Sequence, residues 1–87
     1  MALILSSTGK ETKELKVEDI TIEKLQEVIG SYVERIVVAH LGKVLYVNDE
    51  AALTGLPFNP DASSIAGMTL KGDAVLLTKE EDNEWQR

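Results

Sequence analysis

The sequence predicts a small α+β domain in which one main helix packs on one face of an antiparallel sheet of four to five strands, with one or two short helical turns besides. The 87 residues are enough for a single core. Residues 21–29 have the apolar spacing of a helix, and turn-forming residues separate the short apolar runs elsewhere. We therefore expect one domain over residues 1–78 and an acidic, frayed C-terminal tail over residues 79–87.

The first expected element is a β-hairpin. The apolar run Ala2–Leu5 ends at a cluster of turn formers, residues 6–10, and residues 11–17 then alternate polar with less polar side chains. Charges on the second arm, such as Glu11 and Lys13, favour an edge strand, because charge discourages pairing with another sheet edge.

The main helix is expected over residues 21–29. Thr21 can cap its start and Gly30 can follow its end, and its apolar residues recur at spacings of three and four: Ile22, Leu25, Val28 and Ile29. This apolar stripe should lie on the sheet.

A second hairpin is expected from residues 32–40 and 44–47, which are rich in β-branched residues and are separated by a turn at 41–43. Because both runs are largely apolar, we expect them at the centre of the sheet. Arg35 falls on the same face as Val33 and Val37, and it interrupts an otherwise apolar strand.

The next connection contains many conformationally special residues. Residues 48–53 are typical of a capped helical turn, the loop at 56–60 contains two prolines, and residues 61–66 can form another short helix. Residues 74–77 supply the last strand. The segment 48–62 is either a binding loop or only a structural connection.

Composition limits the classes of function. The net charge of −6 has the wrong sign for neutralising nucleic-acid phosphates, and no apolar run approaches the roughly 20 residues that span a bilayer. The absence of cysteine excludes disulfides and thiolate metal sites. We expect a cytosolic protein that binds neither nucleic acid nor membranes, and that gains stability by forming a homo-oligomer.

The reactive side chains predict neither a catalytic nor a metal site. The chain has one histidine, His40, whereas such a centre needs several converging groups. Solvated surface explains adjacent carboxylates such as Glu80 and Glu81, with a magnesium site as the alternative. We therefore expect a protein that is not an enzyme and needs no cofactor.

Four residues are candidates for binding a ligand: Tyr32, Arg35, Asn48 and Asn59. An aromatic face can stack on a nucleobase, and a guanidinium can form paired hydrogen bonds with a phosphate. In the structural alternative, Arg35 forms an ion pair with Glu34 or Glu50 at the surface, Asn48 caps a helical turn, and Asn59 is restricted to an extended conformation before a proline.

Part of the chain resembles a known family, a group of short uncharacterised proteins encoded by phages, plasmids and their hosts. That family shows a glycine-led strand, an Asn-x-Glu turn, a Leu-Pro-x-Asn-x-x-Ala loop and a closing Gly-Asp strand. The similar segments here are residues 30–34, 47–50, 55–62 and 72–75, with departures at Ser31 and Ala51, where glycine is common. The resemblance implies a mobile-element accessory protein and carries over no catalytic residue.

By analogy with such accessory proteins, we expect a role in counter-defence. The chain would bind and sequester a small nucleotide-type signal in a pocket lined by the four candidate residues. The alternative is a protein-binding inhibitor or adaptor that acts on a host protein through its acidic surface, with Trp85 as an anchor. A small metal-dependent hydrolase is a third interpretation.

Overall fold

The computed structural model describes residues 1–8, 12–30 and 32–86, and part of the predicted first turn, residues 9–11, lies outside this set. In chain order the elements are β1 (Ala2–Leu5), β2 (Thr12–Leu15), the 3-10 turn η1 (Val17–Asp19), α1 (Ile22–Ile29), β3 (Val33–Val38), the 3-10 turn η2 (Ala39–Leu41), β4 (Lys43–Asn48), α2 (Ala51–Thr54), α3 (Pro60–Ala66), β5 (Ala74–Thr78) and α4 (Lys79–Trp85).

The five strands form one antiparallel sheet in the order β2-β1-β5-β4-β3, which confirms the predicted fold class. The expectation that the second hairpin forms the centre is wrong, because β5 is central and β3 lies at an edge. The reason is compositional. Val75 and Leu77 on β5 are fully buried, as in a central strand. On β3 the charged side chains of Glu34 and Arg35 are exposed, which suits a strand at the edge of the sheet.

The predicted main helix is confirmed. Thr21 is its N-cap and accepts a hydrogen bond from the Lys24 amide at 3.0 Å, and Gly30 ends it with φ of 97°, a left-handed conformation that suits glycine. The helix buries Leu25 and Ile29 against one face of the sheet, in a cluster that also holds Ala2, Leu15, Ile20, Val44, Tyr46, Val75 and Leu77.

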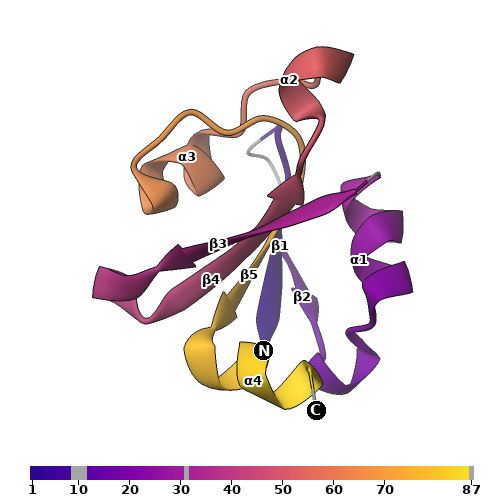
Figure 1. Cartoon of the computed structure of the whole chain (residues 1–87), viewed down its shortest axis with the longest axis vertical. Coiled ribbons are helices and arrows are strands. Elements are labelled where there is room, and N and C mark those ends of the chain that lie inside the picture. Colours follow the sequence, from indigo (N-terminus) through magenta and orange to yellow (C-terminus); the bar gives the residue numbers. More distant parts are fainter. Residues whose placement is uncertain (9–11, 31, 87) are drawn as a thin grey trace.

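The opposite face of the sheet is also covered, so that the domain has three layers (Figure 1). The short helix α3 places Ala62 in a second buried cluster with Leu5, Val38, Leu45, Val47, Leu70 and Ala74. Because both faces are buried, β4 has no polar face and is buried along nearly its whole length. The α2 turn and the segment from α3 to β5 lie together at one end of the sheet, and α4 lies at the other (Figure 1).

The prediction of a frayed tail is wrong for residues 79–86. Thr78 and Glu81 form a reciprocal capping box at the start of α4, with hydrogen bonds of 2.8 and 3.1 Å. At its end the Trp85 ring packs edge-on against Tyr46, with ring centroids 5.7 Å apart. The tail lacks an apolar stripe because this helix is held by one aromatic residue and one buried acid, Asp82.

Candidate functional site

The four predicted ligand-binding residues do not converge on one pocket. Asn59 is 0% exposed. Its amide nitrogen donates to the carbonyl oxygens of Leu5 at 3.0 Å and Gly72 at 2.9 Å, while its oxygen accepts from the Ala62 amide at 3.0 Å as the N-cap of α3. Because these bonds hold the side chain inside the protein, Asn59 lines neither of the two cavities described below, and the structure gives it a role in joining the backbone in place of the predicted contact with a ligand.

Arg35 lies on the α1 and α4 side of the sheet, where its guanidinium is held by Asp82. Its Nε and Nη2 atoms donate to Oδ2 of Asp82 at 2.9 and 2.6 Å. The ion pair that the sequence suggested, with Glu34 or Glu50, is not the one that forms. Arg35 therefore fixes the last helix to the edge strand.

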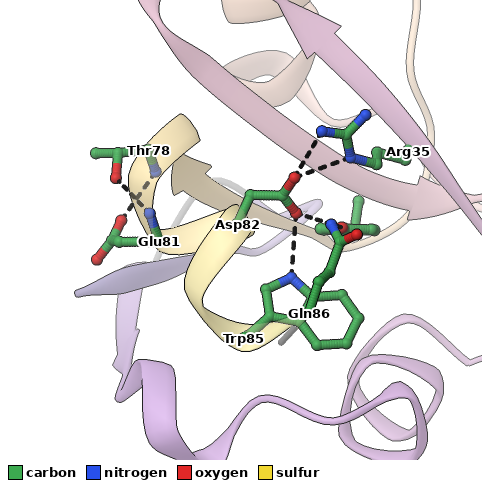
Figure 2. A network of polar contacts seen from close by, with 7 residues as sticks. Arg35, Thr78, Glu81, Asp82, Trp85 and Gln86 are labelled. Carbon is green, nitrogen blue, oxygen red and sulfur yellow. Dashed lines mark hydrogen bonds and ion pairs between the residues drawn. The ribbon is translucent and has the colours of Figure 1, made fainter.

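Asp82 is the centre of a polar network shown in Figure 2. Its side chain is fully buried, and besides Arg35 it accepts hydrogen bonds on Oδ1 from the Tyr46 hydroxyl and from Nε1 of Trp85, the latter at 3.1 Å. Gln86 donates to the Tyr46 oxygen at 3.2 Å. A carboxylate has about four acceptor positions, and Asp82 receives four hydrogen bonds. Its acceptor capacity is used within the protein, so the network is a structural clasp.

The clasp shifts the ionisation of its members. Burial alone raises the pKa of Asp82, but the hydrogen bonds from Arg35, Tyr46 and Trp85 outweigh it, and the pKa lies below its ordinary value. Burial first, and then the hydrogen bond to Asp82, raises the pKa of Tyr46 to about 12. The hydrogen bond to Asp82 likewise raises the pKa of Arg35. The neutral phenol and the charged pair are therefore the stable forms at neutral pH.

Tyr32 and Asn48 lie together, at the other end of the sheet. The Tyr32 carbonyl accepts from the Asp49 amide at 2.9 Å, and its side chain is 68% exposed. The nearly buried Asn48 side chain donates to the Ile29 carbonyl at 3.2 Å and accepts from the Glu50 amide at 2.8 Å, which fixes the end of α1 and the turn after β4. Asn48 also lines a cavity, so one predicted residue is at a site and Tyr32 adjoins it.

This cavity has a volume of about 260 Å³ and lies between the β3–β4 hairpin and the segment before β5. Its charged lining consists of Glu34, Asp49 and Lys71, and the rest is Val47, Asn48, Ala51, Met68, Thr69 and Leu70. The three charged side chains form no ion pair within residues 1–8, 12–30 and 32–86. With two acids and one base, the lining carries a net charge of −1.

Four large apolar or aromatic side chains are exposed on the segments that line or adjoin the cavity: Tyr32, Leu53, Phe58 and Met68, exposed by 68%, 86%, 52% and 53%. Met68 lines the cavity itself, and Tyr32 is bonded to Asp49. Leu53 lies on α2, which begins at the lining residue Ala51. Phe58 pairs with the lining residue Lys71 through an isolated β-bridge. We call the cavity and these four side chains the apical surface.

No local sequence pattern predicts the apical surface as a unit, because its residues come from four separate segments. The resemblance covers the positions of Asn48 and Phe58, and the pairing of Phe58 with Lys71 depends on how the two loops run together. The Gly72 amide donates to the Pro57 carbonyl at 2.7 Å, and the Asn59 amide donates to the Leu70 carbonyl at 2.9 Å. Hydrophobicity alone did not distinguish Leu53 from a core residue.

A second cavity, of about 320 Å³, lies beside α4 and η1 and is lined by Met1, Lys16, Val17, Glu18 and Glu84. It contains none of the predicted site residues. Among the described residues, no group of three or more histidine, aspartate or glutamate side chains is placed to hold a metal ion. In the same set, every helix is too short or too polar to cross a membrane.

Comparison with known proteins gives a family match and no closer relative. A family model with the description "Domain of unknown function (DUF3846)" matches residues 1–86. No curated protein and no solved structure matches the chain.

Proposed function

The chain belongs to the DUF3846 family, and we propose that it is a non-catalytic binding domain that recognises another protein at its apical surface. The observation that carries the proposal is the exposure of Leu53, which is 86% accessible on a short helix beside the cavity. A leucine in this position gains nothing from the fold of its own chain. Burying it against a partner would contribute about 1.5–3 kcal/mol.

The rest of the apical surface has the composition of a recognition site. Aromatic residues and methionine are enriched at the centres of protein interfaces, and here Tyr32, Phe58 and Met68, like Leu53, are exposed on segments that line or adjoin one cavity. Exposed apolar side chains that cluster in this way mark interaction sites more often than single ones do. The predicted anchor Trp85 does not take part, since it packs on Tyr46 at the other end.

The charge of the chain indicates the chemistry of the partner. With a net charge of −6, the protein attracts a basic surface and repels an acidic one during diffusional encounter. Together with the resemblance to phage and plasmid proteins, this supports a counter-defence role in the host cytosol. The chain would block a host protein by occupying a basic and partly apolar surface on it.

The test is a site-specific photo-crosslinking experiment in the cells that express the protein. A photoreactive amino acid at position 53 should capture one protein, whereas the same amino acid at Lys13, on the exposed edge strand β2, should not. The captured protein is then purified and its affinity measured. Leu53→Asp should weaken binding about 30-fold or more, the effect of losing an interface hot spot.

The matched control is Leu41→Asp, which places the same charge at an exposed leucine in η2, away from the apical surface. Equal affinities for the two variants and the wild type would refute the proposed surface.

A nucleotide-type signal is the second candidate ligand, because Lys71 and Asn48 line a cavity, and Tyr32, whose ring is exposed, is bonded through its carbonyl to the lining residue Asp49. An ammonium can hold a phosphate and an aromatic ring can stack on a base. However, the lining acids Glu34 and Asp49 repel phosphate, and 260 Å³ is below the roughly 300–1,000 Å³ of usual ligand pockets. The geometry therefore favours a protein partner.

Thermal unfolding against linear, cyclic and ADP-ribose-derived nucleotides tests this candidate. A ligand at about 100 times its Kd adds roughly 2.7 kcal/mol, and each kcal/mol raises the midpoint of a domain this size by about 4–8 °C. A nucleotide that shifts the midpoint and is recovered unchanged would establish sequestration, and no shift across the panel would remove this candidate.

Self-association is also part of the proposal, and β3 is the edge that supports it. The strand pairs only with β4 among the described residues, and it carries Val37, which is half exposed. The other edge strand, β2, is shorter and exposes Thr12, Lys13 and Glu14, which protect it. Sedimentation should show a dimer that Val37→Lys converts to a monomer, and a wild-type monomer would refute this edge.

A further inference from the structure

Three features of the apical cavity together specify what kind of group fits it: its size, the apolar character of its walls and the sign of its charge. It is open enough to admit a side chain and smaller than pockets that enclose a whole drug-sized ligand, which measure roughly 300–1,000 Å³. A single protruding side chain of another protein is an occupant of suitable size.

The apolar part of the lining is formed by Val47, Ala51, Met68 and Leu70. Val47 and Leu70 are almost fully buried, at 3% and 8% exposed, in the cluster under α3, so they form a small, firmly packed floor, whereas Met68 is 53% exposed and offers the larger apolar surface. An aliphatic stem can lie along such walls and lose its contact with water.

The charged part of the lining has two acids, one on β3 and one directly after β4. Glu34 lies on β3 directly opposite Val47, and Asp49 follows β4 by one residue. Neither carboxylate has an ion-pair partner in the part of the chain that the structure describes. Because the hairpin backbone holds both in place, a cation that enters meets two acceptors whose backbones are already fixed.

We propose that the apical cavity receives one arginine or lysine side chain of the partner protein, with its stem along Met68 above the floor of Val47 and Leu70 and its charged head at Glu34 and Asp49. This inference rests on the proposed function, since it specifies the partner's chemistry at the same surface. Arginine is the better fit, because its planar guanidinium can donate to two carboxylates at once.

Replacing Lys71 distinguishes a cationic occupant from an anionic one, because the affinity should change in opposite directions for the two. Lys71 lines the same cavity, and its ammonium makes no ion pair with either acid among the described residues. It repels an entering cation and attracts an entering phosphate. Lys71→Ala should therefore strengthen the binding of a cation and weaken that of an anion.

The experiment is a nuclear magnetic resonance titration of the isotope-labelled protein with the capped tripeptide Leu-Arg-Leu. Its neutral control is Leu-citrulline-Leu, which has the same shape and lacks the charge. The arginine peptide should shift the amide signals of Glu34, Asp49 and Lys71, with a Kd at least about tenfold lower than that of the citrulline peptide. AMP and inorganic phosphate serve as anionic probes.

Two variants complete the test, and both change exposed side chains, so their thermal midpoints should match the wild type. The double variant Glu34→Gln, Asp49→Asn should lose the preference for the arginine peptide, and Lys71→Ala should increase it. The inference is overturned if the two peptides bind with equal affinity, or if neither binds with a Kd below about 10 mM. It is also overturned if Lys71→Ala lowers the affinity for the arginine peptide.

These outcomes are separate from a failure of the proposed function. If binding of the captured partner depends on Leu53 but not on Glu34 or Asp49, the proposal of the apical surface as the interface is supported. The inference that the cavity receives a cationic side chain is then refuted. If the partner is indifferent to Leu53→Asp, the proposed function fails whatever the peptides do.

Discussion

Arg35 and Asp82, which are 47 positions apart in the chain, join the edge strand β3 to the last helix through two hydrogen bonds of 2.9 and 2.6 Å. The guanidinium is partly in solvent, while the carboxylate is fully buried. This asymmetry decides how the pair behaves, because removing the buried member leaves other buried groups without a partner.

Asp82→Ala should therefore destabilise the domain by about 2–4 kcal/mol, since the Tyr46 hydroxyl and the Trp85 indole lose their acceptor. Urea unfolding at neutral pH measures this difference. The control is Glu84→Gln on the exposed side of the same helix, which should stay within about 0.5 kcal/mol of the wild type. A loss no larger than that of the control would show that the network contributes little.

Acid should weaken the domain through the same carboxylate. The folded-state pKa of Asp82 lies below its ordinary value of 3.8, so the unfolded chain takes up the proton first as the pH falls. The stabilisation is complete above about pH 5 and is lost as the pH falls through 3.8 towards the lower folded value. Burial alone raises the pKa of Glu81, but the hydrogen bonds that its carboxylate accepts from the terminal ammonium and from Thr78 lower it below its ordinary value. Glu81 therefore also makes the domain less stable as the pH falls.

The measurement is urea unfolding of wild type and Asp82→Asn between about pH 6 and pH 3. The variant should lose less free energy of unfolding over this range, because it lacks the titrating group. Parallel pH profiles would mean that Asp82 does not carry the acid sensitivity.

Alkali should weaken the domain through Tyr46. The unfolded phenol ionises near its ordinary pKa of 10.0 and the folded one at about 12, so stability present below pH 10 is lost as the pH rises towards 12. Tyr46→Phe removes this term, and its free energy of unfolding should fall less steeply over the same interval. Identical slopes for the two proteins would contradict the raised pKa.

Asn59→Asp separates the two roles of the buried asparagine. The variant keeps the oxygen that caps α3, but it replaces the amide that donates to Leu5 and Gly72 with an acceptor. We expect a loss of about 3 kcal/mol or more at neutral pH, which exceeds the roughly 1 kcal/mol that Thr21→Ala should cost at the exposed cap of α1. If Asn59→Asp unfolds in urea like the wild type, capping is its whole contribution.

Local signals predicted the elements well. The helix at α1 followed from Thr21, Gly30 and the apolar spacing between them, and both hairpins followed from apolar runs interrupted by turn formers. The order of the strands could not follow from such signals, because β5 takes the centre through pairing with β1 and β4 on either side. Helix α4 was missed because its key residue, Asp82, is a charged side chain that is buried only in the folded chain.

The candidate site was less predictable than the fold. The sequence marks Arg35 as an unusual residue in an apolar strand, but its partner Asp82 lies in residues 79–87, which the sequence predicts to fray. Deleting residues 79–87 consequently removes a packed helix and does not isolate the contribution of Trp85 to binding. The sequence predicts that Asn59 caps a helix or contacts a ligand, whereas in the structure its buried amide also donates to the carbonyl oxygens of Leu5 and Gly72.

The place of β5 at the centre of the sheet has a consequence for biosynthesis. A ribosome adds about 5–20 residues per second, and both hairpins emerge before the strand that joins them. Until β5 has been synthesised, the edges of β1 and β4 that pair with it have unpaired backbone groups. The nascent chain therefore carries two hairpins, each with an open edge that can pair with another strand. Productive folding therefore starts late, and any delay in the final segment lengthens the time during which a chaperone or another nascent chain can bind instead.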